Sequence, residues 1–513
     1  MARTETVIKN SFWAFVNRVT SMLLPFAMRT IIIKILGDQY VGMGSLFTSI
    51  LGVLNLADLG FTGAIIYNMY RPMAQKDTET LCALLNFYRR IYLIVGTVIS
   101  GAGMVLLPFL SHLIKGTPPP GMNIYILYLL QLLNTVLEYY VYGYRVSLFY
   151  ASQRLDIYSR LTLIFRLIQY VTQAIALLTF RNYYAYAIVH TCVVIPQCLY
   201  IGYKTKKLFP AYQPRGTITD EQKKNIFTRV YALLGHKIGG TVIFSIDSII
   251  ISSFLGLTVL GIYSNYYYIL TSVIQITNIL LTSSRPAIGN KIVCDSPAEV
   301  CLTFHRLSFL WNWIVSLAAV CFLCLYQPFI NLWLDSAHLL PMYVVVTIVA
   351  YFYFWQFRVV GLSFKDAGGL WREDWLKPYI GMLANLTLSI AVVVLTKDVI
   401  GVLIPTICVM LFLYFPWETK VIFRTIFKCS PRKYLGRCLV FLLATCAAGF
   451  CTYELCALLP FEGVLPFILR VALCAVVPNA ILLLTFFRTD EFKYYVAIAK
   501  AKTSGVLSRF KRG

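Results

Sequence analysis

Charged residues and histidine are scarce in this sequence. Asp, Glu, Lys and Arg make up only 13% of the 513 residues, and His occurs 5 times, whereas soluble globular proteins carry about 25% charged residues. Hydrophobic residues make up 59% of the chain. Because a membrane-spanning helix needs about 20 mostly apolar residues, this composition excludes an ordinary soluble enzyme. It predicts an all-α membrane protein that crosses the bilayer many times.

Motifs of catalysis and cofactor binding are also missing. The sequence has neither a glycine-rich nucleotide-binding loop nor a motif of paired carboxylates, and only short segments join its apolar stretches. Most of its 14 cysteines fall in apolar runs, where a free thiol behaves as a small hydrophobic group. Cys321 and Cys324 have the spacing of a redox or metal pair, but no second pair, His or acid accompanies them in the sequence. We therefore expect no catalytic residues, no cofactor and no metal site.

Apolar stretches separated by charged or turn residues predict about fourteen membrane-spanning helices. The least distinct boundary separates the eleventh helix from the twelfth, where only Lys397 and Asp398 interrupt the apolar run. The expected centres of the helices are Met22, Leu56, Thr97, Leu132, Ile168, Val194, Gly239, Tyr268, Val315, Tyr351, Leu386, Ile407, Thr445 and Ala475.

The net charge of +23 comes mainly from the loops on one side of the membrane. When the connecting segments are assigned alternately to two sides, one side holds about 34 basic residues and the other holds only Lys34, Lys115, Arg181 and Lys397. Basic loops favour the cytoplasmic side. The sequence therefore predicts an even number of helices with both termini in the cytoplasm, and it gives no reason to expect a nucleic-acid partner.

A short internal repeat relates the two halves of the chain. Residues 35–50 align with residues 254–269 at an offset of 219 residues. This offset corresponds to six helices with their loops, so both copies have the same orientation in the membrane. Parallel repeats of this kind are related by an axis along the membrane normal. The identical positions are Leu36, Gly37, Gly42, Ser45 and Ile50, which recur as Leu255, Gly256, Gly261, Ser264 and Ile269.

The repeat predicts two six-helix bundles followed by two further helices. Substrate sites of repeat-built transporters lie where the repeats meet, so we expect the site between the two bundles. The expected boundaries are 1–210 for the N-terminal bundle, 211–225 for a cytoplasmic linker, 226–430 for the C-terminal bundle, 431–488 for the two added helices and 489–513 for a basic cytoplasmic tail.

The first copy of the repeat and the residues after it resemble a known family. Leu36-Gly37-x4-Gly42, Phe47–Ala64 and Tyr67–Asp77 resemble the oligosaccharide-lipid flippases of the Wzx type. Their superfamily also contains the MATE multidrug exporters and the lipid II flippases. The resemblance implies a MATE-like fold. It also implies that an undecaprenyl-pyrophosphate-linked oligosaccharide is flipped across the bacterial cytoplasmic (inner) membrane by alternating access. The product would be a surface polysaccharide such as O-antigen, capsule or exopolysaccharide.

Ionisable residues inside the predicted spans are the strongest functional candidates, because an intramembrane charge is costly unless it is paired or faces water. Basic residues outnumber acidic ones there by 7 to 3, which favours an anionic substrate. Arginine binds phosphate oxygens with two parallel hydrogen bonds, and lysine acts as a point charge. The candidate pyrophosphate-binding residues, one of them at the inner end of the eighth helix, are Arg18, Arg29, Arg145, Arg166, Lys237, Arg285 and Arg358.

Arg18 and Lys237 occupy equivalent positions of the repeat, which favours two cations facing one cavity. Two simpler explanations stay open for Arg18: its side chain reaches the inner membrane surface, or it pairs with Asp58. Arg470 is expected to be structural. Polar residues on the same set of helices are candidates for contacting the sugar rings or a coupling ion: Asp58, Glu138, Asp247, Asn134, Tyr142, Gln275 and Asn278.

Several alternatives stay open. A MATE-type multidrug or cation antiporter shares the fold but would need an acidic and aromatic cavity, whereas a lipid II flippase would suit the same basic cavity. A membrane glycan polymerase or ligase would need a soluble loop with catalytic acids, and we interpret Glu373 and Asp374 as part of a solvated turn. Transport could be coupled to a proton or sodium gradient or to the membrane potential. The expected partners are the lipid-linked oligosaccharide, membrane lipids and other polysaccharide-assembly proteins.

Overall fold

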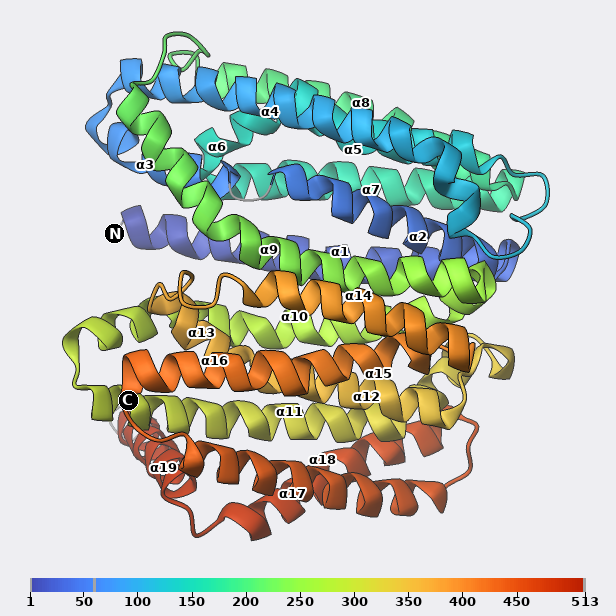
Figure 1. Cartoon of the computed structure of the whole chain (residues 1–513), viewed down its shortest axis with the longest axis vertical. Coiled ribbons are helices and arrows are strands. Elements are labelled where there is room, and N and C mark those ends of the chain that lie inside the picture. The colour runs from blue at the N-terminus through green and yellow to red at the C-terminus, as the bar shows by residue number, and fades with distance from the viewer. Residues whose placement is uncertain (1, 59–60, 511–513) are drawn as a thin grey trace. The chain divides into compact units, whose positions relative to one another are not determined.

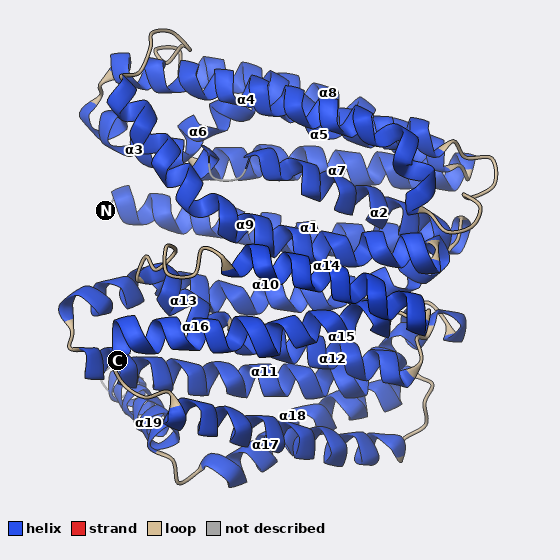
Figure 2. Ribbon diagram, viewed as in Figure 1, coloured by secondary structure: helices blue, strands red, loops and turns tan. Residues whose placement is uncertain are grey.

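The computed structural model consists of helices joined by loops (Figures 1 and 2). It describes the backbone of residues 2–58 and 61–510, but not the side chains at 2–8, 11, 57, 58, 62, 64, 229, 231–244, 280 and 501–510. In this described part of the chain no β-strand occurs, which confirms the predicted all-α fold. The chain divides into two compact units, Met1–Asn265 with Pro378–Asp398, and Tyr266–Lys377 with Val399–Gly513.

The first unit is built mainly on pairs of helices that contact each other along their lengths. α7 packs against both α1 and α8, and α2 packs along α9. The helices of this unit are α1 (Ala2–Ile35), α2 (Asp38–Leu54), α3 (Phe61–Gln75), α4 (Thr78–Leu106), α5 (Ile124–Val141), α6 (Gly143–Ala151), α7 (Leu155–Phe180), α8 (Tyr183–Leu208), α9 (Asp220–Leu255), the beginning of α10 (Leu257–Cys294), and most of α14 (Lys377–Thr396), with short 3₁₀ turns at Asn55–Asp58 and Leu107–Leu113.

The second unit is organised around α11, which contacts α12, α17 and α18. Two π-helical segments flank α16; such segments are rare and often mark functional sites. The remaining elements are the rest of α10, α11 (Pro297–Trp333), the 3₁₀ turn Ser336–His338, α12 (Met342–Phe357), α13 (Val359–Ala367), α15 (Ile400–Cys408), η4 (Val409–Tyr414), α16 (Phe415–Ile422), η5 (Phe423–Phe427), α17 (Arg432–Ala457), α18 (Val464–Phe486) and α19 (Asp490–Phe510).

Within the described residues, 11 helical segments are long and apolar enough to cross a membrane. All fourteen expected centres lie in helical segments, with Leu56 in the 3₁₀ turn between α2 and α3. The α2–α3 pair, α9 and α10 are not among the 11 segments, so the count of fourteen stays a prediction. The expected boundary at Lys397 and Asp398 is confirmed, because α14 ends at Thr396 and α15 begins at Ile400.

Helix starts in the connecting segments are fixed by side-chain caps. Thr219 at the start of α9 and Ser296 at the start of α11 each form a capping box with the third residue of the helix, which satisfies backbone N–H groups that the helix leaves unpaired. Asp77 caps α4 by accepting a hydrogen bond from the Thr80 backbone at 3.0 Å. The hydrogen bonds from Thr80 hold the pKa of the Asp77 carboxyl below its ordinary value.

The two copies of the internal repeat have the same local conformation. Gly37, which precedes α2, has φ 102° and ψ 173°, and the equivalent Gly256, which precedes α10, has φ 96° and ψ 173°. A residue with a Cβ is strained at such φ values. Both copies therefore need glycine to join their two helices, and this agreement supports the repeat seen in the sequence.

The two copies also pack against each other within the first unit. A Cβ on Gly42 of α2 would overlap the carbonyl oxygen of Leu257, and a Cβ on Gly261 of α10 would overlap that of Asp38. The repeat offset places Leu257 at the position of Asp38 and Gly261 at the position of Gly42. The same contact is thus made twice, as at a two-fold interface. An approximate two-fold axis passes between the glycines, where the two helix backbones approach closely.

Candidate functional site

A polar cluster surrounds Arg29 in the first unit. The guanidinium group of this half-buried residue of α1 donates hydrogen bonds to Ser264 Oγ at 2.7 Å and to Asn265 Oδ1 at 2.9 Å. Asn265 on α10 has no exposed surface, and its Nδ2 has no hydrogen-bond partner among the described residues. The positive charge of Arg29 is therefore held by a hydroxyl and an amide at a packed helix contact.

Side chains of α7 and α8 extend this cluster. Gln173, which is fully buried, donates to the backbone oxygen of Tyr186 at 3.2 Å and accepts a hydrogen bond from Gln169 at 3.2 Å. Tyr186 interacts electrostatically with Arg29. The ring centroid of Tyr186 lies 5.2 Å from that of Tyr183. We call Arg29, Gln173, Tyr186, Ser264 and Asn265 the Arg29 cluster. Four helices contribute to it, so amide, hydroxyl and aromatic groups surround one guanidinium.

Arg166 on α7 forms a second contact with α1. Its guanidinium donates to Asn17 Oδ1 at 2.8 Å and to the Asn17 backbone oxygen at 3.2 Å, and Asn17 donates to Thr162 Oγ1 at 3.3 Å. Arg18, the next residue on α1, is exposed. In the described part of the chain no carboxylate pairs with Arg166, so its charge is held by an amide.

The fourth predicted span also brings predicted residues together. Tyr142, buried at the break between α5 and α6, is hydrogen-bonded to Glu138 and to Tyr158. Next to this break, Arg145 is buried at 8% exposure and donates from Nε to the Tyr144 hydroxyl at 2.8 Å. At this break, therefore, the acidic Glu138 has the hydroxyl of Tyr142 as its partner, and the basic Arg145 has the hydroxyl of Tyr144.

Other predicted residues lie in separate places. Asn134 contacts His190 at 3.4 Å, Asp247 is buried on α9, and Gln275 and Asn278 are half-buried on α10. The side chains of Asp58 and Lys237 lie outside the described residues. Two expectations therefore stay predictions: that Arg18 pairs with Asp58, and that Arg18 and Lys237 face one cavity.

The second unit contains a buried network of five charged residues. Arg358 makes a two-pronged contact with Glu418, at 3.0 Å from Nε and 2.6 Å from Nη2. Lys377 bridges Glu418 and Asp374 at 2.6 Å each, and Lys365 reaches Asp374 at 2.8 Å. We call these five residues the Glu418 network. Its charges are largely balanced internally, so the structure gives Arg358 a carboxylate partner.

Sequence reasoning missed both acids of this network. The expectation that Asp374 belongs to a solvated turn is wrong, because its side chain is fully buried. The segment after α13 folds back so that Lys365, nine residues earlier, reaches the carboxylate. Glu418 directly follows the apolar run Val409–Trp417, and an acid at the end of such a run was a usable signal. Arg285, another predicted site residue, is exposed and lies 3.6 Å from Asp366.

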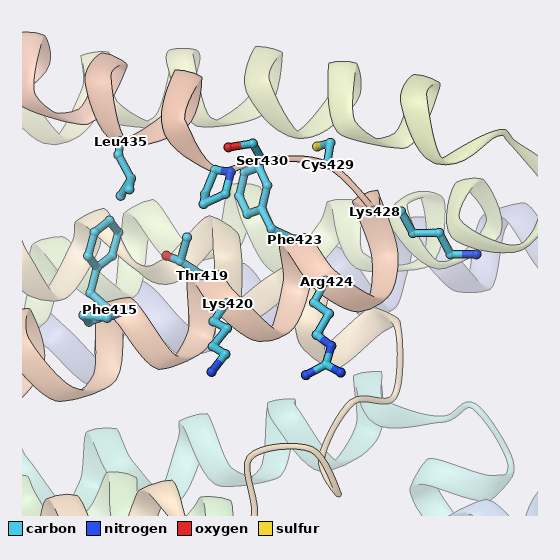
Figure 3. A pocket seen from close by; sticks show the side chains of 11 residues that line it. Phe415, Thr419, Lys420, Phe423, Arg424, Lys428, Cys429, Ser430 and Leu435 are labelled. Atoms are coloured by element: carbon cyan, nitrogen blue, oxygen red, sulfur yellow. The ribbon is translucent and has the colours of Figure 1, made fainter.

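A groove of about 780 Å³ lies between α16 with η5 and the start of α17 (Figure 3). Phe415, Phe423 and Leu435 line it, whereas Lys420 and Arg424 extend away from α17. The lining suits a hydrocarbon chain better than a charged group, so we do not place the pyrophosphate site here.

Comparisons with known proteins agree with this fold. The lipid II flippase MurJ in an inward closed conformation has a TM-score of 0.65 at 14% identity, with 93% of this chain and 99% of that chain covered. An inward-facing MATE family multidrug resistance transporter of the MOP superfamily has a TM-score of 0.62 at 14% identity and 78% and 94% coverage. An outward-facing MATE family transporter has a TM-score of 0.55 at 13% identity and 83% and 97% coverage.

None of the curated proteins matches the sequence. Residues 7–290, more than half of the chain, match the family described as "Polysaccharide biosynthesis protein". The match includes the first repeat copy, the Arg29 cluster and Arg166. The all-helical architecture, its apolar spans and the transporter folds that it resembles agree with this assignment. This chain is a multi-pass membrane protein that belongs to the polysaccharide biosynthesis protein family.

Proposed function

We propose that this protein flips an undecaprenyl-pyrophosphate-linked oligosaccharide from the cytoplasmic to the outer leaflet of the bacterial cytoplasmic membrane. Family membership supports a role in polysaccharide biosynthesis. The fold it shares with transporters solved in inward-facing and outward-facing states supports alternating access. The protein acts in this proposal as a transporter without a chemical step, within the machinery that builds a surface polysaccharide.

One observation about charge carries the choice of substrate. In the first unit, uncharged side chains bind two arginines of the predicted spans: Asn17 binds Arg166, and Tyr144 binds Arg145. Arg358 in the second unit, by contrast, is bound by a carboxylate. Neutral partners orient a guanidinium without cancelling its charge. This unit therefore keeps positive charge available for an anion.

A pyrophosphate group has the negative charge and the hydrogen-bond acceptors that such a site would bind. It carries about two negative charges and cannot cross about 30 Å of hydrocarbon unaided. Guanidinium groups bind its oxygens through paired, charge-assisted hydrogen bonds. Amides and tyrosines near these arginines suit the sugar hydroxyls and ring faces, and the prenyl tail stays in the lipid. Gln169, Gln173, Asn134 and Tyr186 are the side chains that we assign to the glycan.

Energy coupling is assigned to the intramembrane acids of the first unit. Glu138 contacts Tyr142, and Asp247 is buried on α9. A carboxyl that binds a proton or a sodium ion in one state and releases it in the other would couple the ion gradient to transport. We propose these two residues as the coupling candidates, and we place both termini in the cytoplasm. A fluorescent protein fused to the C-terminus, which fluoresces only when folded inside the cell, tests that orientation.

The proposal is tested by transport in proteoliposomes that contain the purified full-length protein. We expect movement of lipid-linked oligosaccharide, and slower movement or none for lipid II and for a cationic dye. Because hydrogen bonds to charged groups contribute about 1.5–3 kcal/mol, Arg166→Gln should slow transport about 10- to 100-fold. Arg166→Lys should keep part of the activity.

Arg160→Gln on the same helix is the matched control. The guanidinium of Arg160 stacks on Trp13 at 4.7 Å from the ring centroid, near the predicted inner surface, so its loss should leave transport nearly unchanged. Transport of the cationic dye without any movement of lipid-linked oligosaccharide would contradict the proposed substrate. Transport of lipid II alone would keep the flippase role and replace the glycan.

A further inference from the structure

Four cysteines from three helices meet in the second unit. The Sγ atoms of Cys324 on α11, Cys456 on α17 and Cys474 on α18 all lie within 4.8 Å of one another. Their side chains are buried, at 4%, 4% and 0% exposure. Cys321, one helical turn before Cys324, places its thiol against that of Cys474. Cys321 and Cys324 have no second pair of cysteines near them in the sequence, but the fold brings Cys456 and Cys474 next to them.

The surroundings of these thiols are apolar. The cluster packs against Val320 and Ala448, with Leu473 and Ile481 at its edge. Sulfur is therefore the metal-binding atom that these surroundings supply, and thiolate sites select soft ions such as Cu⁺ and Zn²⁺. Hard cations, which need several oxygen ligands, do not fit the cluster.

A buried positive charge lies beside the cluster. Arg470 precedes Cys474 by one turn of α18 and is only 4% exposed. Its guanidinium donates to the backbone oxygens of Leu459 at 2.9 Å and Phe461 at 3.3 Å. A neighbouring arginine stabilises a thiolate, and the thiolate is the form that binds metals.

We propose that Cys324, Cys456 and Cys474, with Cys321 as a fourth ligand, bind one soft d¹⁰ metal ion, Cu⁺ or Zn²⁺. Metal–sulfur bonds of about 2.3 Å place the sulfurs of a tetrahedral site about 3.8 Å apart. The thiols of Cys324, Cys456 and Cys474 therefore need to approach by at most about 1 Å from their present limit of 4.8 Å, and Cys321, which packs against these residues, would have to turn its thiol toward the same ion. Four thiolates leave two net negative charges around Zn²⁺ and three around Cu⁺, and Arg470 offsets one of them.

Such an ion would join α17 and α18 to α11. Cys456 is the second-to-last residue of α17, and Cys474 lies in the middle of α18, so the ion would bind both helices of the C-terminal pair. Arg470 then has a defined role as the charge-balancing neighbour of the site. This role is independent of the transported substrate.

The test uses the purified full-length protein in detergent, stripped with a chelator and then loaded with Cu⁺ or Zn²⁺ in separate samples. We expect about one equivalent of metal to survive desalting against a weak chelator. X-ray absorption of the loaded protein should show a first shell made of sulfur alone. Cys324→Ala and Cys474→Ala should each weaken binding at least about tenfold. Arg470→Gln should weaken it about 10- to 100-fold, as is typical for residues that support the ligands of a metal site.

Cys438→Ala is the matched control, because Cys438 is equally buried on α17 but lies outside the cluster; this variant should bind metal normally. Protection from a thiol-reactive reagent gives a readout that needs no variant. Metal should shield the four clustered cysteines and leave the exposed Cys192 and Cys446 reactive. Oxygen or nitrogen bound to the metal, unchanged binding in both cluster variants, or a disulfide that peptide mapping places between two of the four clustered cysteines would each overturn the proposal.

Discussion

The close contact between the two repeat copies makes a quantitative prediction about Gly42. An alanine there would place its Cβ 2.9 Å from the Leu257 carbonyl carbon and 3.0 Å from the Gly261 nitrogen, and closer still to the Leu257 oxygen. All three atoms are backbone, so relief requires the helices to separate by roughly 1 Å, and such overpacking costs about 1–3 kcal/mol. Because alanine favours a helix over glycine by about 1 kcal/mol, Gly42→Ala should lower stability by a net amount of up to about 2 kcal/mol.

Thermal unfolding of the purified protein in detergent, followed by intrinsic fluorescence, is the assay. Gly101→Ala on α4 is the control, because no atom lies within 4 Å of a Cβ at that position, and it should be neutral or slightly stabilising. Gly261→Ala should resemble Gly42→Ala. The double variant should cost less than the sum of the two, because one helix separation relieves both overlaps. Equal unfolding temperatures for Gly42→Ala and Gly101→Ala would refute the close crossing.

Three further predictions concern charge and capping. Glu418→Gln leaves Arg358 without its buried carboxylate and Lys377 with Asp374 alone, so it should destabilise the protein by about 3–5 kcal/mol; adding Arg358→Gln should recover part of this loss in the same unfolding assay. Ser296→Ala removes a capping box and should cost about 1 kcal/mol, whereas Ser296→Asp should cost little. The hydrogen bond with His338 holds the pKa of Asp335 below its ordinary value. Its stabilisation is therefore complete above the unfolded-state pKa and is lost as the pH falls through the lower folded-state pKa, and Asp335→Asn should remove this acid dependence from pH-resolved unfolding curves.

Features encoded locally along the chain were predictable from the sequence. Hydropathy located helical segments at all fourteen expected centres, and Lys397 with Asp398 marked a true break between α14 and α15. The repeat was visible because Gly37 and Gly256 must adopt the same unusual backbone conformation, which restricts both positions to one residue type. Signals of this kind need no knowledge of distant contacts.

Features that depend on distant contacts were not predictable. Asp374 lies in a charged segment, and it is buried because that segment folds back so that Lys365 of α13 reaches its carboxylate. The four-cysteine cluster needs α17 and α18 to pack against α11, which no spacing in the sequence reveals. Arg29 was predictable as an intramembrane cation, but its partners Ser264 and Asn265 follow only from the crossing of the repeat copies.

The crossing of the two copies also shows where they have diverged. Each glycine faces the backbone of the other copy, so a larger side chain on either one disturbs both, and neither copy is free to change alone at this point. The two copies differ at the position of Arg29, because its counterpart at the repeat offset is Ser248. The counterpart of its partner Ser264 is Ser45. A symmetric scaffold thus carries an asymmetric charge. A duplicated structure can gain a one-sided binding property in this way without losing the packing that its two copies share.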